Sequence, residues 1–241
     1  QELKSFVARF SANLSKSAQA TSRKKSLEKI QLDEIVPSNR KYPFIGFEIE
    51  KQLGKDVLEV ENLSASLDGV KLFSNVSFIV NRGDKVALLG KNDLAKTTLL
   101  KVLAGEIKPD SGSIKWGQTV SKSYFPSDNE PYFKDNEQNL IEWLRQFSKE
   151  KDETFIRGFL GKMLFSGEET FKSARVLSCG EKVRCMLSRL MLAHGNLLMF
   201  NEPTSHLDLE SIQALNNAMK DFKGTVLFSS HDHTIIQSVS N

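Results

Sequence analysis

The 241-residue sequence contains no apolar run that approaches the ~20 residues needed to cross a bilayer. No short apolar run follows basic residues near its start, so we expect no secretory signal peptide in this stretch. Only two cysteines are present, Cys179 and Cys185, in neither a CxxC pair nor a Cys/His cluster. The sequence therefore favours neither a zinc site nor a disulfide framework, and it is typical of a protein in the reducing cytosol.

Charge is close to balanced, with a formal net charge of +3, but it is unevenly distributed. Residues 1–30 contain seven Lys or Arg and two Glu, so this stretch carries +5 and the remainder −2. The seven basic residues are Lys4, Arg9, Lys16, Arg23, Lys24, Lys25 and Lys29. A basic segment beside a near-neutral domain fits a polyanionic partner, most simply RNA, and it fits equally the solvated face of an exposed helix.

Apolar residues recur at helical spacing in the same segment, and no Gly or Pro interrupts them before Pro37. They are Leu3, Phe6, Val7, Phe10 and Leu14, followed by Leu27, Ile30 and Ile35. This pattern predicts a long helical arm over residues 1–36 that packs along one narrow stripe. Residues 37–56 are richer in Pro and Gly and are interpreted as a connecting segment.

From residue 57 to residue 241, short apolar runs alternate with helical patterns. Strands are expected at 57–60, 72–80, 86–89, 197–200 and 226–228. Helices are expected at 98–104, 140–147, 154–165 and 181–193. The alternation predicts an α/β domain with a largely parallel core sheet and an antiparallel β portion at its start.

A loop lies between the expected strand at 86–89 and the helix that follows it. It reads Gly90, Lys91, Asn92, Asp93, Leu94, Ala95, Lys96, Thr97 and Thr98. The loop matches the phosphate-binding pattern G-x-x-x-x-G-K-[ST] except at Ala95, where the pattern has Gly. Backbone N–H groups at a helix N-terminus bind phosphate, Lys96 would reach the β- and γ-phosphates of a nucleotide, and Thr97 would ligate Mg²⁺. A strand–turn–helix that carries Lys-Thr-Thr by chance stays an alternative for this loop taken alone.

Three further motifs follow this loop in order. Residues 177–182 (LSCGEK) resemble the LSGGE signature of ABC (ATP-binding-cassette) ATPases, and residues 197–208 (LLMFNEPTSHLD) resemble their Walker B strand and D-loop. His231 follows the strand expected at 226–228, as the family's switch histidine does. From Leu58 onward the sequence thus resembles an ABC nucleotide-binding domain. The resemblance implies the P-loop NTPase fold, with an antiparallel β subdomain and a helical subdomain that carries the signature.

Two details resemble the ABC-F subfamily: the EPTxHLD pattern at 202–208, and Glu181-Lys182 after the signature. Members of that subfamily are soluble ATPases with two ABC domains joined by a helical linker, and they act on ribosomes. The resemblance implies that residues 1–36 are part of such a linker. It also implies that residues 57–241 are the second ABC domain, which we expect to continue beyond Asn241. The implied cofactors are ATP and Mg²⁺, and the implied partners are a second ABC domain and the ribosome or its RNA. A cytoplasmic location without direct membrane contact is expected.

By the same resemblance, Glu202 is the catalytic carboxylate that orients or deprotonates the attacking water, and His231 contacts the γ-phosphate. Two ABC domains sandwich ATP in the family, so Ser178 and Gly180 would contact the nucleotide of the opposite site from a helix N-terminus. Asn201 stands where the family has the Walker B Asp that supports Mg²⁺, which makes Thr97 and Asn201 the candidate metal residues. Ser127 stands at the position of the Q-loop glutamine.

Several of these residues depart from the family pattern on the Walker side of the site. Asp93 replaces a usual Gly and brings a carboxylate toward phosphate, and two unit charges ~4 Å apart at an effective dielectric constant of ~20 repel by about 4 kcal/mol. Ala95 adds a Cβ where the backbone approaches phosphate, and Asn201 lacks the charge that Mg²⁺ prefers. We therefore expect a degenerate Walker site, weak or inactive in ATP hydrolysis, beside a signature that can still complete the other site.

Three alternatives remain open at this point. The departures could be tolerated, with slow ATP turnover at this site. The chain could be the ATPase subunit of an ABC transporter, although the basic arm and the Ser at the Q-loop position argue against that reading. It could also be a catalytically silent ABC scaffold domain.

Overall fold

The computed structural model describes residues 42–241, so the helical arm predicted at 1–36 lies outside the described residues. In the connecting segment, residues 42–49 have no regular secondary structure, although Ile45 and Leu53 are buried. Among the helices of residues 42–241, none is both long enough and apolar enough to span a membrane.

An antiparallel sheet forms the first part of the described chain. Its strands run in the order β2-β1-β4. Their bounds are β1 (Asp56–Leu67), β2 (Val70–Asn81) and β4 (Ser111–Trp116). A two-residue turn, Asp68-Gly69, joins β1 to β2, and both of its residues have positive φ angles, 50° and 78°. Asp-Gly is the sequence that such tight hairpin turns favour, because both central residues adopt left-handed backbone angles.

A four-stranded parallel sheet forms the centre of the molecule, with strands in the order β3-β7-β6-β5. The strands are β3 (Lys85–Ala87), β5 (Lys122–Phe125), β6 (Leu197–Asn201) and β7 (Thr225–Ser229). Every residue of β6 and β7 is buried, as expected for a parallel sheet covered on both faces. Leu198 and Phe200 belong to one hydrophobic cluster, whereas Leu197 and Met199 belong to the other, because alternate residues of a strand point to opposite faces.

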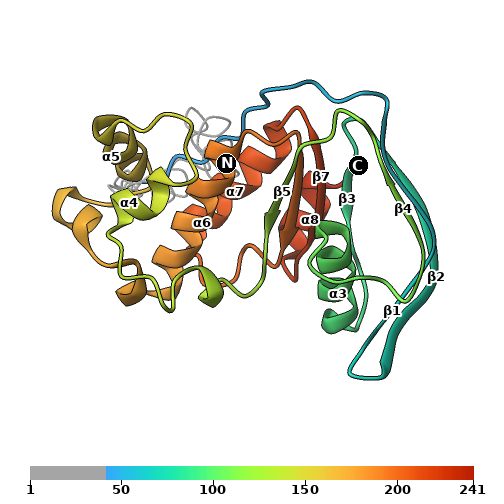
Figure 1. The fold of residues 1–241 in the computed structure, drawn as a ribbon. Coiled ribbons are helices and arrows are strands. Elements are labelled where there is room, and N and C mark those ends of the chain that lie inside the picture. The colour runs from blue at the N-terminus through green and yellow to red at the C-terminus, as the bar shows by residue number, and fades with distance from the viewer. Residues whose placement is uncertain (1–41) are drawn as a thin grey trace, which may run out of the picture. The chain divides into compact units, whose positions relative to one another are not determined.

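Helices cover both faces of the parallel sheet (Figure 1). One face carries α6 (Cys179–Ala193), α7 (Leu209–Asp221) and α8 (His233–Val239). The other face carries α3 (Asp93–Ala104), which lies between the two sheets and buries Leu100 and Leu103 there.

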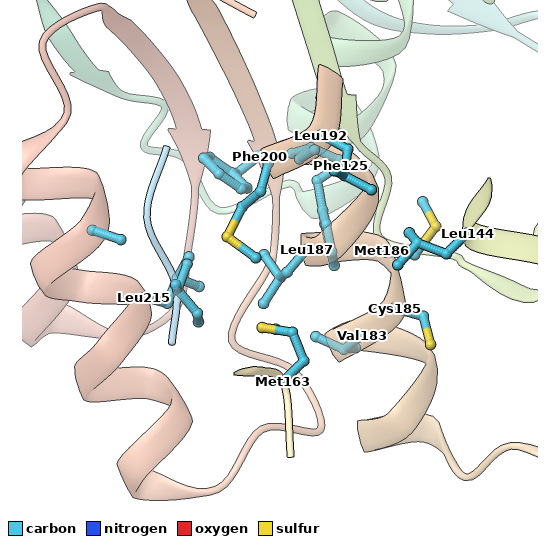
Figure 2. Close-up of a cluster of buried hydrophobic side chains, with 14 of the residues drawn as sticks. Phe125, Leu144, Met163, Val183, Cys185, Met186, Leu187, Leu192, Phe200 and Leu215 are labelled. Atoms are coloured by element: carbon cyan, nitrogen blue, oxygen red, sulfur yellow. The ribbon is translucent and has the colours of Figure 1, made fainter. Parts of the chain in front are cut away.

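A helical subdomain packs against α6 on the side away from the antiparallel sheet (Figure 1). It contains α4 (Leu140–Arg145), α5 (Glu153–Lys162) and the 3-10 turns η1 (Glu130–Tyr132), η2 (Gly167–Phe171) and η3 (Ala174–Val176). In Figure 2, Met186 of α6 lies next to Leu144 of α4, while Leu187 points toward α7. Helix α6 therefore joins the helical subdomain to the parallel sheet through one continuous core.

The expected α/β architecture is confirmed: a largely parallel core sheet, an antiparallel β subdomain and a helical subdomain. The signature residues follow η3 of that subdomain and begin α6. One boundary differs in a way that affects the site, because α3 begins at Asp93 and not at residue 98. Asn92 caps this helix, since its side chain accepts a hydrogen bond from the Ala95 N–H, and Asp93 places a negative charge in the first turn. Both features stabilise a helix start.

Candidate functional site

The residues expected to carry the chemistry gather at one edge of the parallel sheet. The loop at 88–92 follows β3, Asn201 ends β6, Ser229 ends β7, and Ser127 lies two residues after β5. These positions follow four neighbouring strands, and the carboxyl ends of parallel strands meet at the same edge. That edge is where open α/β sheets bind ligands.

Four charged or ionisable side chains meet at this edge. Lys96 Nζ lies 2.8 Å from Asp93 Oδ1 and 3.8 Å from Glu202 Oε1. His231 Nε2 lies 3.3 Å from Asp93 Oδ2 and 3.6 Å from Glu202 Oε1. Lys96 and Glu202 are largely buried, with side chains 9% and 14% exposed, whereas Asp93 and His231 are more than half exposed. Two carboxylates therefore share one buried ammonium, and we call these four residues the charged cluster.

Glu202 is held by the backbone of the neighbouring strand end. Its N–H donates to the Ser229 carbonyl at 3.1 Å, and its Oε2 accepts a hydrogen bond from the His231 N–H at 3.0 Å. Oε1 is buried and accepts no hydrogen bond within residues 42–241. The residue also has a φ of 49°, a left-handed angle that is strained for a side chain other than Gly. The fold thus fixes this carboxylate in place and leaves one of its oxygens facing Lys96 and His231.

The phosphate-binding loop is shorter than the sequence pattern implies. Because α3 already begins at Asp93, the Ala95 N–H donates to the Asn92 side chain and the Lys96 N–H donates to the Asn92 carbonyl. Two N–H groups that an anion could use are therefore engaged within the chain. The residues expected to line the loop divide by exposure: Gly90, Lys91, Asn92, Asp93 and Leu94 are exposed, whereas Thr98 is only 1% exposed.

A neutral hydrogen-bond network stands where the family resemblance implies a magnesium ion. The Asn201 side chain is fully buried, and its Nδ2 lies 3.2 Å from Thr97 Oγ1 and 3.1 Å from Ser127 Oγ. Its Oδ1 accepts a hydrogen bond from Ser229 Oγ at 2.9 Å. Ser229 matches no motif in the sequence, and its only sequence signal is its place at the end of a buried strand, two residues before His231. We call Thr97, Ser127, Asn201 and Ser229 the neutral network.

The neutral network brings no charged ligand toward a Mg²⁺ ion. Mg²⁺ in proteins is bound mainly by carboxylate oxygens and water, and the neutral network supplies no charge. The nearest carboxylates, Asp93 and Glu202, both face Lys96, the residue that would have to neutralise the phosphates. An incoming triphosphate would therefore meet two negative charges and only one buried positive charge.

The signature lies at the start of α6, and Ser178 is its N-cap. Ser178 Oγ accepts from the Glu181 N–H at 3.3 Å, while Glu181 Oε2 accepts from the Ser178 N–H at 2.8 Å, which is a capping box. Burial raises the pKa of Glu181, but its hydrogen bonds with Ser178 and Lys172 outweigh that effect, so the net pKa is lowered. The capping box fixes an exposed helix N-terminus and leaves the Ser178 side chain at the surface.

The contacts of the described residues do not join Ser178 or Gly180 to the charged cluster. Gly180 instead approaches the D-loop, where a Cβ added to it would lie 3.0 Å from the His206 carbonyl oxygen. Ser127 of the neutral network lines a pocket of about 130 Å³ with Cys179 and His206, and no residue of the charged cluster lines that pocket. The geometry therefore separates a Walker face, with the charged cluster, from a signature face at the start of α6.

The fold and comparison with known proteins together show the family of the chain. A parallel sheet covered by helices, with a loop before a helix that carries Lys-Thr at its ligand edge, defines a nucleotide-binding domain of the P-loop NTPase class. A family model described as ABC transporter matches residues 73–205, and a second with the same description matches residues 1–47. The chain belongs to the ABC transporter family and is an ABC ATPase domain.

Its relatives support the same assignment. It is 59% identical to "Uncharacterized ABC transporter ATP-binding protein YkpA" of Bacillus subtilis, over 100% of this chain and 45% of that protein. It is 32% identical to "ABC transporter F family member 5" of Arabidopsis thaliana, over 99% of this chain and 34% of that protein. Among solved structures, "Structure of ATP binding subunit of ABC transporter" is 25% identical with a TM-score of 0.63, over 76% of this chain and 83% of the other. The chain spans less than half the length of these two relatives.

Proposed function

We propose that this chain is one ABC domain of a cytoplasmic ABC-F-type ATPase that works with a second ABC domain and acts on the ribosome. The EPTxHLD pattern at 202–208 and Glu181-Lys182 support the subfamily. So does the match of 99% of the chain to an F family member of Arabidopsis thaliana. In this arrangement the exposed start of α6 faces the nucleotide of the other ABC domain, while the Walker face binds Mg-ATP weakly or not at all.

One observation carries the proposal of a weak Walker site: the Asp93 carboxylate is paired with both Lys96 and His231. These are the two side chains that the family uses on the terminal phosphates. The neutral network around Asn201 and the internal hydrogen bonds of Ala95 and Lys96 act in the same direction. Each one removes a charge or a donor that Mg-ATP would need.

Titration of the purified chain with Mg-ATP tests the weak site. We expect no saturation below about 1 mM, which corresponds to a binding free energy weaker than about −4 kcal/mol. Lys96→Ala should change this little, because Lys96 is already engaged by two carboxylates. Lys91→Ala is the matched control, since it removes an exposed lysine from the same loop. Low-micromolar binding that Lys96→Ala abolishes and Lys91→Ala preserves would contradict the proposal.

Sedimentation of the full-length parent protein with ribosomes tests the partner. We expect co-sedimentation at low salt that weakens steeply as salt rises, because each Lys or Arg that contacts a phosphate releases counterions. Replacing Arg23, Lys24 and Lys25 with glutamine should reduce both the affinity and its salt dependence. These three residues lie outside the described residues and within the stretch that carries +5.

The control for this experiment removes the same charge elsewhere. Lys115 and Lys149 are 76% and 69% exposed, and Lys151 is also exposed, all within the ABC domain. Their replacement with glutamine should leave ribosome binding nearly unchanged. Absence of the intact protein from ribosomes at low salt would refute the ribosomal assignment, and fractionation with membranes would favour a transporter subunit instead.

A further inference from the structure

Asp93 has both of its carboxylate oxygens engaged by side chains from different parts of the chain. Oδ1 lies 2.8 Å from Lys96 Nζ, one turn further along α3. Oδ2 lies 3.3 Å from Nε2 of His231, which follows β7. The carboxylate thus bridges the buried lysine of the loop to the exposed histidine, although the Asp93 side chain itself is 58% exposed.

The Asp93 carboxylate lies between Lys96 and His231 as a bound anion would. Lys96 is the lysine of the phosphate-binding pattern, and such a lysine meets the outermost phosphates of a nucleotide. A carboxylate resembles a phosphate in presenting two charged oxygens to cationic or N–H donors. The hydrogen bond with Lys96 lowers the pKa of Asp93, so this carboxylate is ionised at neutral pH. The Asp93 carboxylate therefore engages both Lys96 and His231, the two side chains that would otherwise meet a phosphate.

The position of the Asp93 carboxylate affects the binding of nucleoside triphosphates and diphosphates unequally. A third phosphate needs both Lys96 and the space beside His231, and Asp93 contacts both. A nucleotide with only two phosphates competes with Asp93 for Lys96 and need not reach His231. Electrostatic repulsion by Asp93 should therefore weaken triphosphate binding more than diphosphate binding.

We propose that Asp93 is a specificity-determining residue of the Walker face. Its carboxylate takes the place of a terminal phosphate between Lys96 and His231. The site therefore selects against nucleoside triphosphates relative to diphosphates. This inference rests on the proposed weak Walker site and adds which residue sets the weakness and which phosphate it excludes. The role differs from those of Ala95 and Asn201, which lower the affinity without contacting His231.

Equilibrium dialysis of the chain with radiolabelled ATP and ADP, in EDTA so that magnesium plays no part, tests the inference. Asp93→Asn keeps the size of the side chain and removes its charge. Asp93→Gly restores the residue that the family usually has and removes the carboxylate entirely. We expect ATP affinity to rise about tenfold or more in both variants and ADP affinity to rise less than about threefold. The measured quantity is the ratio of the two affinities, which a merely structural change would not shift.

Glu153→Gln is the matched control. Glu153 lies in the first turn of α5, and its carboxylate is 53% exposed, close to the 58% of Asp93. Its replacement should leave the ratio of ATP to ADP affinity unchanged. Thermal unfolding of each variant shows whether it is folded, and a folded protein from either Asp93 variant is sufficient for the test.

The outcomes separate the inference from the proposed function. If both nucleotides gain equally, or if neither gains, the selectivity assigned to Asp93 is wrong, while the weak Walker site still stands through Ala95 and Asn201. If the unaltered chain already binds ATP in the low-micromolar range, the weak Walker site itself fails.

Discussion

Replacing Trp143 with alanine is expected to lower the free energy of unfolding by about 3–5 kcal/mol, the range found when a large aromatic side chain is removed from a core. Trp143 of α4 is only 1% exposed and stacks on Phe133, with ring centroids 4.7 Å apart. The Trp143 ring also packs edge-to-face with Phe147, with ring centroids 5.1 Å apart, and its indole N–H donates to the Tyr132 carbonyl at 3.1 Å. The replacement would remove both ring contacts and leave the partly buried Tyr132 carbonyl without this donor.

Chemical denaturation of the chain measures this loss. Trp143→Phe keeps an aromatic ring and removes only the N–H donor and part of the volume, so an intermediate loss of about 1–2 kcal/mol is expected. Ile79→Ala is the control, because Ile79 on β2 is 66% exposed and its replacement should cost no more than about 0.5 kcal/mol. A cost of Trp143→Ala no larger than that of this control would show that Trp143 does not stabilise the helical subdomain. The packing bears on function because α4 contacts α6, whose first turn is the signature.

Several elements predicted correctly from the sequence have a strong burial pattern, although β2, expected at 72–80, has only one buried residue. The runs at 197–200 and 226–228 are apolar throughout and became fully buried strands. Strand β4 gave no such signal, because its residues SGSIKW are mostly exposed and pair only with one edge of β1. Helix α7 was also missed, although Asp208 caps it and Leu215 and Met219 lie four residues apart on its buried face. The sequence therefore does contain a helix-start signal at this position.

For the candidate site, the motifs predicted which strand ends carry the functional side chains. They did not predict what those side chains contact. The pairing of Asp93 with His231 depends on how closely the start of α3 approaches the end of β7, which is set by packing between distant segments. One local signal was available, because Asn92 followed by Asp93 is a helix N-cap followed by an acidic first turn. Read that way, the sequence would have placed the helix start inside the phosphate-binding pattern.

Replacing Asn201 with aspartate is expected to destabilise the chain in the absence of metal by about 1–3 kcal/mol. Asn201 is fully buried, and the three side chains that hydrogen-bond with it, Thr97, Ser127 and Ser229, are hydroxyl residues without charge. These hydroxyls can turn to donate to a carboxylate, but they cannot neutralise it. Because burial raises the pKa of a carboxyl, the loss should be complete at neutral pH. It should shrink as the pH falls and vanish below the pKa of about 3.9 that an aspartate has in the unfolded chain.

The same substitution should make the stability depend on Mg²⁺, because it creates the charged ligand that the neutral network lacks. Thermal unfolding in EDTA and in millimolar Mg²⁺ with ATP measures this dependence, and a ligand at ten times its Kd stabilises the folded state by about 1.4 kcal/mol. Asn196→Asp is the matched control. Asn196 is equally buried, but it lies just before the first residue of β6, at the opposite end of the strand from Asn201. Its side chain hydrogen-bonds with the backbone of Lys51, Thr119 and Ser121. Asn196→Asp should lose stability whether or not Mg²⁺ is present. An equal response of both variants to Mg²⁺ would show that residue 201 does not face the metal position, and the neutral network would then be no more than a buried polar contact between strand ends.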